Sequence, residues 1–308
     1  MKVAPNRSEV SPNEAEGDKN IMAVHCYFKK VGTGKESIVF FPAAGFSGIE
    51  GEIFADYFHQ DYQLFLCDLP GYGRSSGFDQ SIKTKDLADW VIQFFNEEKL
   101  DKVHLIGHSV GGFVCLCVAY HYPDRVRSLT LLDSGHFNLP RFPSEMGKSA
   151  VLMPLLSLLS RIFKRKIYPF IGRYILPSIE DSSDTIETQE NFLKFCRWMH
   201  LNDANPYVSE AFFKAAVPLK QAGLPLHICF YQARPKKMLS AIRIPVCLFY
   251  ASYEGIEKKR EQFERKNIKS FLNQPNIRII KVPGAHYVLW SEESPLPETA
   301  EFIRAAGN

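Results

Sequence analysis

The chain lacks any uninterrupted apolar run of about 20 residues, the length that crosses a bilayer, although it is 308 residues long. Residues 1–20 are polar and mixed in charge, and they lack the apolar core typical of a secretory signal. We therefore expect a disordered tail at 1–20, no transmembrane segment and a cytoplasmic location.

The chain also lacks a strong excess of charge of one sign. Its 37 Lys and Arg residues face 34 Asp and Glu residues, so the formal net charge is only +3. No basic stripe runs along the sequence and no nucleic-acid-binding motif occurs. Nucleic acid is accordingly excluded as an expected partner.

Paired cysteines are missing as well. The seven cysteines are odd in number and include no C-x-x-C pair, which argues against a disulfide framework and against a zinc site. Most of them lie inside apolar runs, where cysteine behaves as a small buried hydrophobe. We expect reduced thiols, no metal ion and no organic cofactor.

One motif stands out among what is present. The pentapeptide GHSVG at 107–111 lies between an apolar run at 103–106 and another at 113–119. A strand, a G-x-S-x-G turn and a helix in this order form a nucleophile elbow, in which small flanking residues permit a tight, strained turn. The turn would hold the Ser109 hydroxyl at the carboxyl edge of a sheet, and the amide of Val110 at the helix start would be free to bind an oxyanion.

Apolar runs with strand character alternate with amphipathic helical patterns on both sides of this motif. This alternation predicts an α/β fold with a doubly wound, mostly parallel sheet and right-handed crossovers. Ligands of such sheets bind beyond the carboxyl ends of the strands. Ser109, Asp133 and the loop after Phe41 all fall at such ends.

The strand rhythm stops between 136 and 240, where apolar, proline-interrupted helical segments such as 151–163 occur. We interpret this region as a helical cap inserted after the strand that ends near Asp133. The predicted organisation is a tail at 1–20, a core formed by 21–135 and 241–308, and a cap at 136–240.

In these features the chain resembles the α/β-hydrolase superfamily, and its capped serine hydrolases of the esterase and lipase type. The resemblance rests on the GHSVG elbow, on the D-x-P-G-x-G-x-S segment at 68–75, on Ile244-Pro245 opening a late strand, and on Gly284-Ala285-His286 near the C-terminus. It covers nearly everything after residue 24.

The resemblance implies a catalytic triad. Ser109 would be the nucleophile and His286 the general base, in the family's chain order of serine, acid and histidine. Glu254 occupies the place where the family usually has an Asp, and we expect it to be the acid. Asp133, at the end of the preceding strand, is the alternative acid.

The resemblance also implies an oxyanion hole formed by the backbone amides of Val110 and Phe46. Relatives often carry His-Gly in the loop where this chain has Ala44-Gly45, so Gly45 is expected to line the substrate site. His136 lies just past a strand end and is a candidate contact to substrate.

The expected reaction is hydrolysis of a carboxylic ester with an apolar acyl or aryl group, through an acyl-enzyme intermediate. A thioesterase, a lactonase or a carbon–carbon bond hydrolase would use the same residues. From a different class, a small-molecule receptor or a lyase with this fold stays an alternative. The basic stretch at 161–166 is typical of a solvated helix end, and it also suits a membrane surface or an anionic substrate such as an acyl-CoA.

Overall fold

The computed structural model describes residues 25–141, 151–174 and 188–307. The predicted tail at 1–20 therefore lies outside the described residues, as do the parts 142–150 and 175–187 of the predicted cap. No helix of the described ranges is both long and apolar enough to pass through a bilayer.

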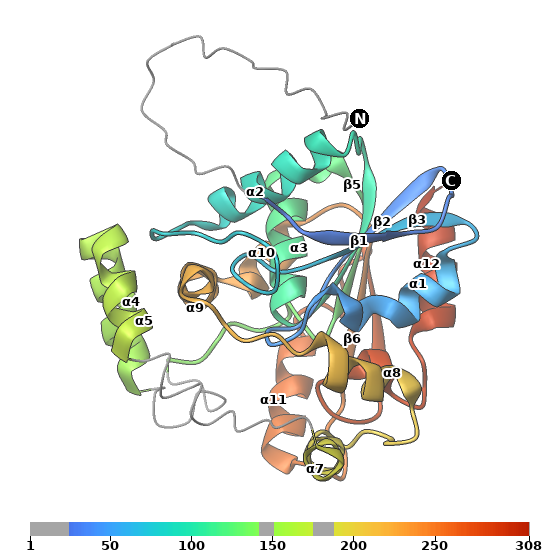
Figure 1. Cartoon of the computed structure of the whole chain (residues 1–308). Coiled ribbons are helices and arrows are strands. Elements are labelled where there is room, and N and C mark those ends of the chain that lie inside the picture. Colours follow the sequence, from blue (N-terminus) through green and yellow to red (C-terminus); the bar gives the residue numbers. More distant parts are fainter. Residues whose placement is uncertain (1–24, 142–150, 175–187, 308) are drawn as a thin grey trace, which may run out of the picture.

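A seven-stranded sheet forms the centre of the molecule (Figure 1). Its strands in spatial order are β1 (Phe28–Val31), β3 (Tyr62–Cys67), β2 (Glu36–Phe41), β4 (Val103–His108), β5 (Val126–Leu132), β6 (Val246–Ala251) and β7 (Ile277–Val282). Only β1 runs antiparallel to its neighbour, and all other pairs are parallel. The predicted mostly parallel sheet is confirmed.

Helices cover both faces of the sheet. The described helices are α1 (Glu52–Phe58), α2 (Thr84–Glu97), α3 (Val110–His121), α4 (Met153–Phe163), α5 (Ile167–Tyr174), α7 (Gln189–Met199), α8 (Pro206–Glu210), α9 (Leu224–Gln232), α10 (Pro235–Ala241), α11 (Lys258–Ile268) and α12 (Leu296–Gly307). One apolar core packs α2, α3 and α10 on one face, and a second packs α1 and α12 on the other. The fold is thus doubly wound, as predicted.

Helix α3 is the central element of the first core. Its residues from Val110 to Ala119 are all buried, and its apolar side chains point in every direction. A helix that is apolar all round must be covered on all sides. The sheet, α2 and α10 supply that cover, and they fix the position of the residue that precedes the helix.

The described helices from α4 to α10 all come between β5 and β6, where the sequence predicts the inserted cap. This insertion is joined to the core by an antiparallel bridge between Phe46 and Ala216. The Ser47 amide donates to the Ala215 carbonyl (2.7 Å), and the Val217 amide donates to the Gly45 carbonyl (2.8 Å). The loop after β2 therefore has a fixed relation to the end of α8 and the turn that follows it.

All seven cysteines are buried free thiols, as the sequence predicts. Burial raises the pKa of thiols such as Cys115, Cys117 and Cys247, because a thiolate is poorly solvated in an apolar core.

Candidate active site

The predicted turn at the GHSVG motif is present and strained. Ser109 has φ 51° and ψ −116°, a backbone conformation that is rare for any residue except glycine. β4 ends at His108 and α3 begins at Val110, so Ser109 is the only residue between strand and helix. A side chain at Gly111 would come within 2.1 Å of the Phe41 carbonyl oxygen, which explains the glycine after the serine.

His286 and Asp133 form a close pair beside this turn. Nδ1 of His286 lies 2.6 Å from Oδ2 of Asp133, and the side chain of Asp133 is completely buried whereas that of His286 is 26% exposed. The other Asp133 oxygen accepts a hydrogen bond from the Ala251 amide (3.0 Å). Asp133 also has a positive φ of 47°, so the strand-end carboxylate is held in a fixed, strained position.

The electrostatics of this pair favour an ionised carboxylate. Burial alone would raise the pKa of Asp133, because a charge in the interior is poorly solvated. The hydrogen bond to His286 and the electrostatic interactions with His286 and His136 outweigh burial and lower the pKa of Asp133 to about 2. An ionised Asp133 holds the proton of His286 on Nδ1 and leaves Nε2 as the basic atom of the ring.

Glu254 does not occupy the predicted place of the acid. Its carboxylate is exposed and forms ion pairs with Lys281 (2.6 Å) and Arg265 (2.8 Å). Both contacts lower the pKa of Glu254, and the contact with Lys281 has the larger effect. The expectation that Glu254 orients His286 is therefore corrected, and Asp133, the alternative, makes that contact.

Within the described ranges the Ser109 hydroxyl makes no hydrogen bond to His286; Ser109 follows β4 and His286 follows β7, and β5 and β6 lie between these strands in the sheet. Such contacts are often long without substrate and tighten in the complex. Ser109, Asp133 and His286 follow β4, β5 and β7, so all three lie toward the carboxyl edge of the sheet, and their catalytic roles stay predictions.

The predicted oxyanion hole needs one correction. The Val110 amide, at the first position of α3, has no acceptor within the helix and carries the positive end of the helix dipole. The Phe46 amide, in contrast, donates to the Ala43 carbonyl at 3.2 Å and is engaged in its own turn. Among the described residues, the amides of Ala44 and Gly45 have no acceptor, which makes them the better candidates in this loop.

Gly45 has φ 94°, and nothing lies within 4 Å of the place where a side chain would stand. The loop is thus open on that side. Its predicted role as a substrate contact stays a prediction.

A buried ion pair that sequence analysis missed lies behind the elbow. Nδ1 of His108 lies 2.8 Å from Oε1 of Glu50, and neither side chain is exposed. Oε2 of Glu50 accepts the Ala43 amide (2.7 Å), and Nε2 of His108 donates to the His286 carbonyl (3.0 Å). Two side chains thereby join the loop after β2, the serine turn and the histidine loop. In the sequence, only the presence of His108 before Ser109 in the GHSVG motif hints at this network.

The charge of this pair predicts a stability that depends on pH. Burial alone would lower the pKa of His108, but Glu50 and the His286 carbonyl raise it above its ordinary value. A raised pKa means that the folded state favours the protonated ring. The stabilisation is therefore complete below the ordinary histidine range and is lost as pH rises through the raised pKa.

We expect Glu50→Gln to lower the free energy of unfolding by about 3 kcal/mol near pH 6, because it leaves a buried imidazolium without its counter-ion. The difference in free energy of unfolding between Glu50→Gln and the natural protein should become smaller as the pH rises, because His108 then loses its proton. Urea unfolding at a series of pH values measures it. Glu52→Gln is the matched control, since Glu52 pairs only with Lys29 near the surface and should cost less than about 1 kcal/mol. Equal losses for the two variants would contradict the assignment.

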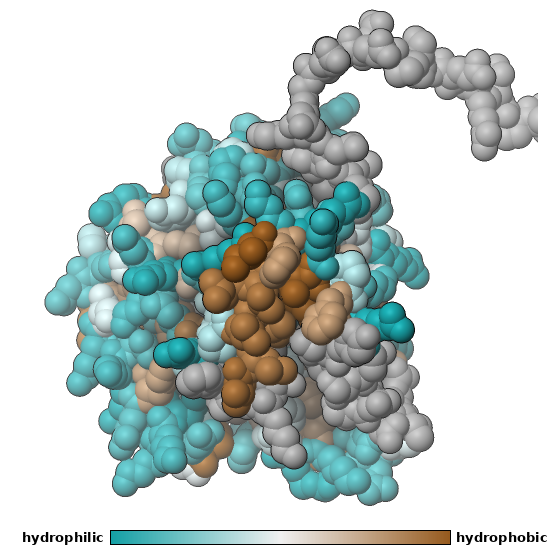
Figure 2. All heavy atoms as spheres, turned by 90° about the vertical axis from the view of Figure 1, so that its left-hand side faces the viewer, coloured by the Kyte–Doolittle hydropathy of each residue, from teal (hydrophilic) through white to brown (hydrophobic). Residues whose placement is uncertain are grey.

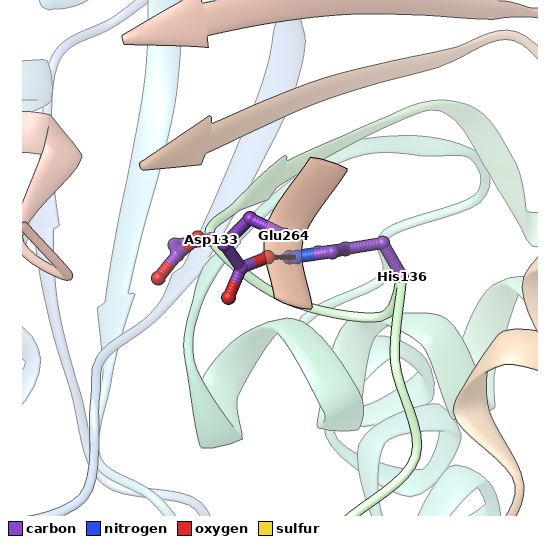
Figure 3. Close-up of side chains that lie close together, drawn as sticks. All are labelled: Asp133, His136 and Glu264. Atoms are coloured by element: carbon purple, nitrogen blue, oxygen red, sulfur yellow. Dashed lines mark hydrogen bonds and ion pairs between the residues drawn. The ribbon is translucent and has the colours of Figure 1, made fainter. Parts of the chain in front are cut away.

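Asp133 belongs to a second buried cluster with His136 and Glu264 (Figure 3). The candidate ligand atoms of these residues lie within 4.8 Å of one another, close enough for a metal ion. However, Nε2 of His136 is 2.5 Å from Glu264, and Nε of Arg260 lies 2.9 Å from the other Glu264 oxygen. Both Glu264 oxygens thus already lie close to nitrogen atoms of the protein, so we interpret the cluster as a polar network beside Asp133.

This cluster also corrects the expectation for His136. The ring is fully buried, Nδ1 lies 3.3 Å from the Ser134 carbonyl and Nε2 contacts Glu264. With both nitrogens engaged inside the protein, His136 has no polar atom left for a substrate.

Aromatic side chains connect the loops around the site. The rings of Tyr287 and Trp290 stack at 5.1 Å, and Phe46 meets both edge-on at 5.8 and 5.9 Å. Phe195 of α7 contacts Phe46 and Tyr287 as well. A cavity of about 540 Å³ opens beside them; Ala285 and Tyr287, the chain neighbours of His286, line it, whereas Ser109 and His286 do not.

The sheet topology, with a strained serine turn and a histidine–carboxylate pair toward its carboxyl edge, indicates the class of fold to which this protein belongs. Residues 38–293 match the family model described as the alpha/beta hydrolase fold, and the chain belongs to that family. The predicted resemblance is confirmed.

Individual relatives agree with this assignment. The chain is 25% identical to the pimeloyl-[acyl-carrier protein] methyl ester esterase of Edwardsiella ictaluri over 76% of the chain and 81% of that protein. It is 31% identical to the (E)-2-((N-methylformamido)methylene)succinate hydrolase of Acinetobacter baylyi, over 25% of the chain and 30% of that protein. The chain spans less than a third of the length of several curated relatives that it matches.

Among solved structures, a thermophilic esterase from Thermogutta terrifontis superimposes with a TM-score of 0.62 at 15% identity, covering 92% of this chain and 95% of the esterase. At this identity the likeness shows the fold alone. Together the comparisons support hydrolase chemistry in general, and they point to no particular substrate.

Proposed function

We propose that this protein is a serine-dependent carboxylic ester hydrolase with Ser109, His286 and Asp133 as its catalytic residues. The observation that carries the proposal is the buried, ionised Asp133 held 2.6 Å from Nδ1 of His286, beside a serine in a strained turn between strand and helix. This is the arrangement that activates a hydroxyl as a nucleophile.

In the proposed reaction the Ser109 hydroxyl transfers its proton to Nε2 of His286 while Oγ attacks the ester carbonyl carbon. The Val110 amide, with an amide of Ala44 or Gly45, holds the negative charge that develops on the carbonyl oxygen. His286 then gives its proton to the departing alkoxide. Water, deprotonated by the same ring, releases the acid from the acyl-enzyme. Asp133 stabilises the imidazolium in both steps.

The proposed substrate is an ester with an apolar acyl or aryl group. The aromatic rings of Phe46 and Tyr287 lie on loops that also carry candidate catalytic groups, and Phe195 of α7 packs against both rings. Apolar walls with few polar groups are typical of small-molecule sites. We further propose that helices between β5 and β6 form a cap, because their chain pairs with the loop at Gly45. The name of the Edwardsiella relative, a methyl ester esterase, supports an ester substrate.

A series of p-nitrophenyl esters of increasing acyl length tests this proposal. We expect turnover of the natural protein, with kcat/KM rising up to about fourfold for each methylene that the pocket buries. Values of kcat/KM that do not change with acyl length would contradict the proposed apolar pocket. Failure to turn over any ester or thioester by the folded protein would contradict the hydrolase proposal and favour a receptor.

A further inference from the structure

Helix α4 carries apolar side chains on its outward face as well as on its inward face, where Met153 is buried and Leu156 and Leu159 pack against residues of α5 and α9. Ser157 and Ser160 are also buried on the inward face; the Ser157 backbone carbonyl and the Ser160 hydroxyl accept hydrogen bonds from the Gln232 side-chain amide, each at 3.1 Å. Leu155, Leu158 and Ile162, in contrast, are 53%, 54% and 61% exposed. The helix is thus apolar on its packed side and on its solvent side, whereas a surface helix ordinarily turns polar residues toward solvent.

The exposed residues follow the helical period and form one stripe. We define the α4 stripe as Leu152, Leu155, Leu158 and Ile162, which recur at intervals of three and four residues and therefore share a face. Phe163 and Phe170, both about half exposed, extend it toward α5. Figure 2 shows hydrophobic side chains gathered into one continuous patch on the side of the molecule that carries α4 and α5. Patches of this kind mark interaction sites.

The surroundings of the stripe carry positive charge. Residues 151–173 contain five Lys or Arg residues and no Asp or Glu; the cations are Arg161, Lys164, Arg165, Lys166 and Arg173. Arg165 pairs with Asp79, and Lys164 and Lys166 are exposed at the end of the helix.

A cavity of about 380 Å³ adjoins the inner side of α4. Ser157 and Arg161 of the helix line it together with Arg141 and Arg234, and among the residues that the structure describes no acidic side chain lines it. The stripe is therefore bordered both by exposed cations and by an arginine-lined hollow.

We propose that the α4 stripe binds the surface of an anionic phospholipid bilayer. A helix with leucine, isoleucine and phenylalanine on one side and lysine and arginine beside them lies in the plane of the interface, with its apolar face among the acyl chains and its cations at the headgroups. The Lys and Arg residues beside the stripe favour an anionic bilayer over a neutral apolar partner. Each cation near the surface of an anionic membrane adds electrostatic attraction, which a neutral partner would not provide. The inference goes beyond the proposed ester hydrolysis and does not depend on it.

Co-sedimentation of the full chain with vesicles tests the proposal. We compare vesicles of phosphatidylcholine alone with vesicles in which about a third of the lipid is phosphatidylglycerol. Binding should be at least about tenfold tighter to the anionic vesicles, and it should weaken at about 0.5 M salt, where charges are screened. Leu155→Gln/Leu158→Gln/Ile162→Gln should weaken it by at least about 30-fold, because three anchoring side chains are lost.

Two control variants are matched to these changes. Leu272→Gln alters a leucine that is 64% exposed but lies beyond α11, and it should bind like the natural protein. Arg161→Gln/Lys164→Gln/Lys166→Gln should lose about tenfold or more in affinity for anionic vesicles, whereas Lys258→Gln/Lys259→Gln on α11 should lose none.

Three results would overturn the proposal. The first is equal sedimentation of the natural protein and the stripe triple variant, and the second is a natural protein that stays in solution with both kinds of vesicle. The third is a dimer, seen by light scattering, that the triple variant no longer forms, in which case a second copy covers the stripe. Thermal unfolding completes the test. The triple variant should melt within a few degrees of the natural protein, and a large loss would mean that the stripe packs against this chain itself.

Discussion

Ser109→Ala is expected to lower kcat for ester hydrolysis by about 10⁴- to 10⁶-fold, the largest effect of any single change in this chain. The alanine removes the only atom that would bond to the acyl group, while the strained turn and the amides of the oxyanion hole stay in place. What rate is left would come from substrate binding and charge stabilisation alone. End-point assays with long incubation, on protein purified from contaminating esterases, measure the decrease in kcat.

Covalent labelling by a fluorophosphonate separates chemistry from binding in the same variant. The natural protein should be labelled, and both Ser109→Ala and His286→Ala should not. Ser240→Ala is the matched control, because the Ser240 hydroxyl bonds only the Lys236 carbonyl on α10. Labelling of Ser109→Ala at the natural rate would show that another residue is the nucleophile.

Asp133→Asn should lower kcat by about 10⁴-fold, the second largest effect. Asparagine retains an oxygen for the Ala251 amide, so the loop keeps its hydrogen bond. Its NH2 group would face Nδ1 of His286, however, and would hold the ring in the tautomer whose Nε2 carries the proton. Such a ring cannot accept the proton of Ser109. Steady-state kinetics should show the loss in kcat, with KM little changed.

Glu254→Gln is the matched control for the acid, because it makes the same chemical change in the residue that sequence position favours. Its carboxylate pairs with Lys281 and Arg265 at the surface, so its loss should change kcat less than about twofold. If Glu254→Gln lost activity as Asp133→Asn does, the assignment of the acid to Asp133 would be wrong.

The sheet and the elbow could be predicted from the sequence because local pattern fixes them. Apolar runs such as 103–106, followed by a glycine-flanked serine, have few alternatives to a strand, a tight turn and a helix. The parallel order follows from the alternation of these units. The histidine could be found because it comes directly after the last strand.

The acid and the second oxyanion donor could not be predicted in this way. Whether Asp133 or Glu254 reaches His286 depends on the three-dimensional arrangement of the loops that follow β5 and β6. Lys281 of β7 and Arg265 of α11 form ion pairs with Glu254 and hold it away from His286. The direction of the Phe46 amide depends on a turn that closes onto Ala43. The exposed apolar stripe of α4 could not be predicted either, because a helix that is apolar on several sides does not reveal from its composition which side is covered.

The reactivity of the buried thiols reports on local unfolding of this protein. A cysteine reacts with an alkylating reagent only as an accessible thiolate, and all seven thiols are shielded in the folded chain. Each therefore becomes reactive only when the element around it opens, so Cys115 in α3 and Cys196 in α7 would report on the core and on the insertion separately. Inactivation by iodoacetamide would accordingly measure unfolding and would say nothing about the nucleophile.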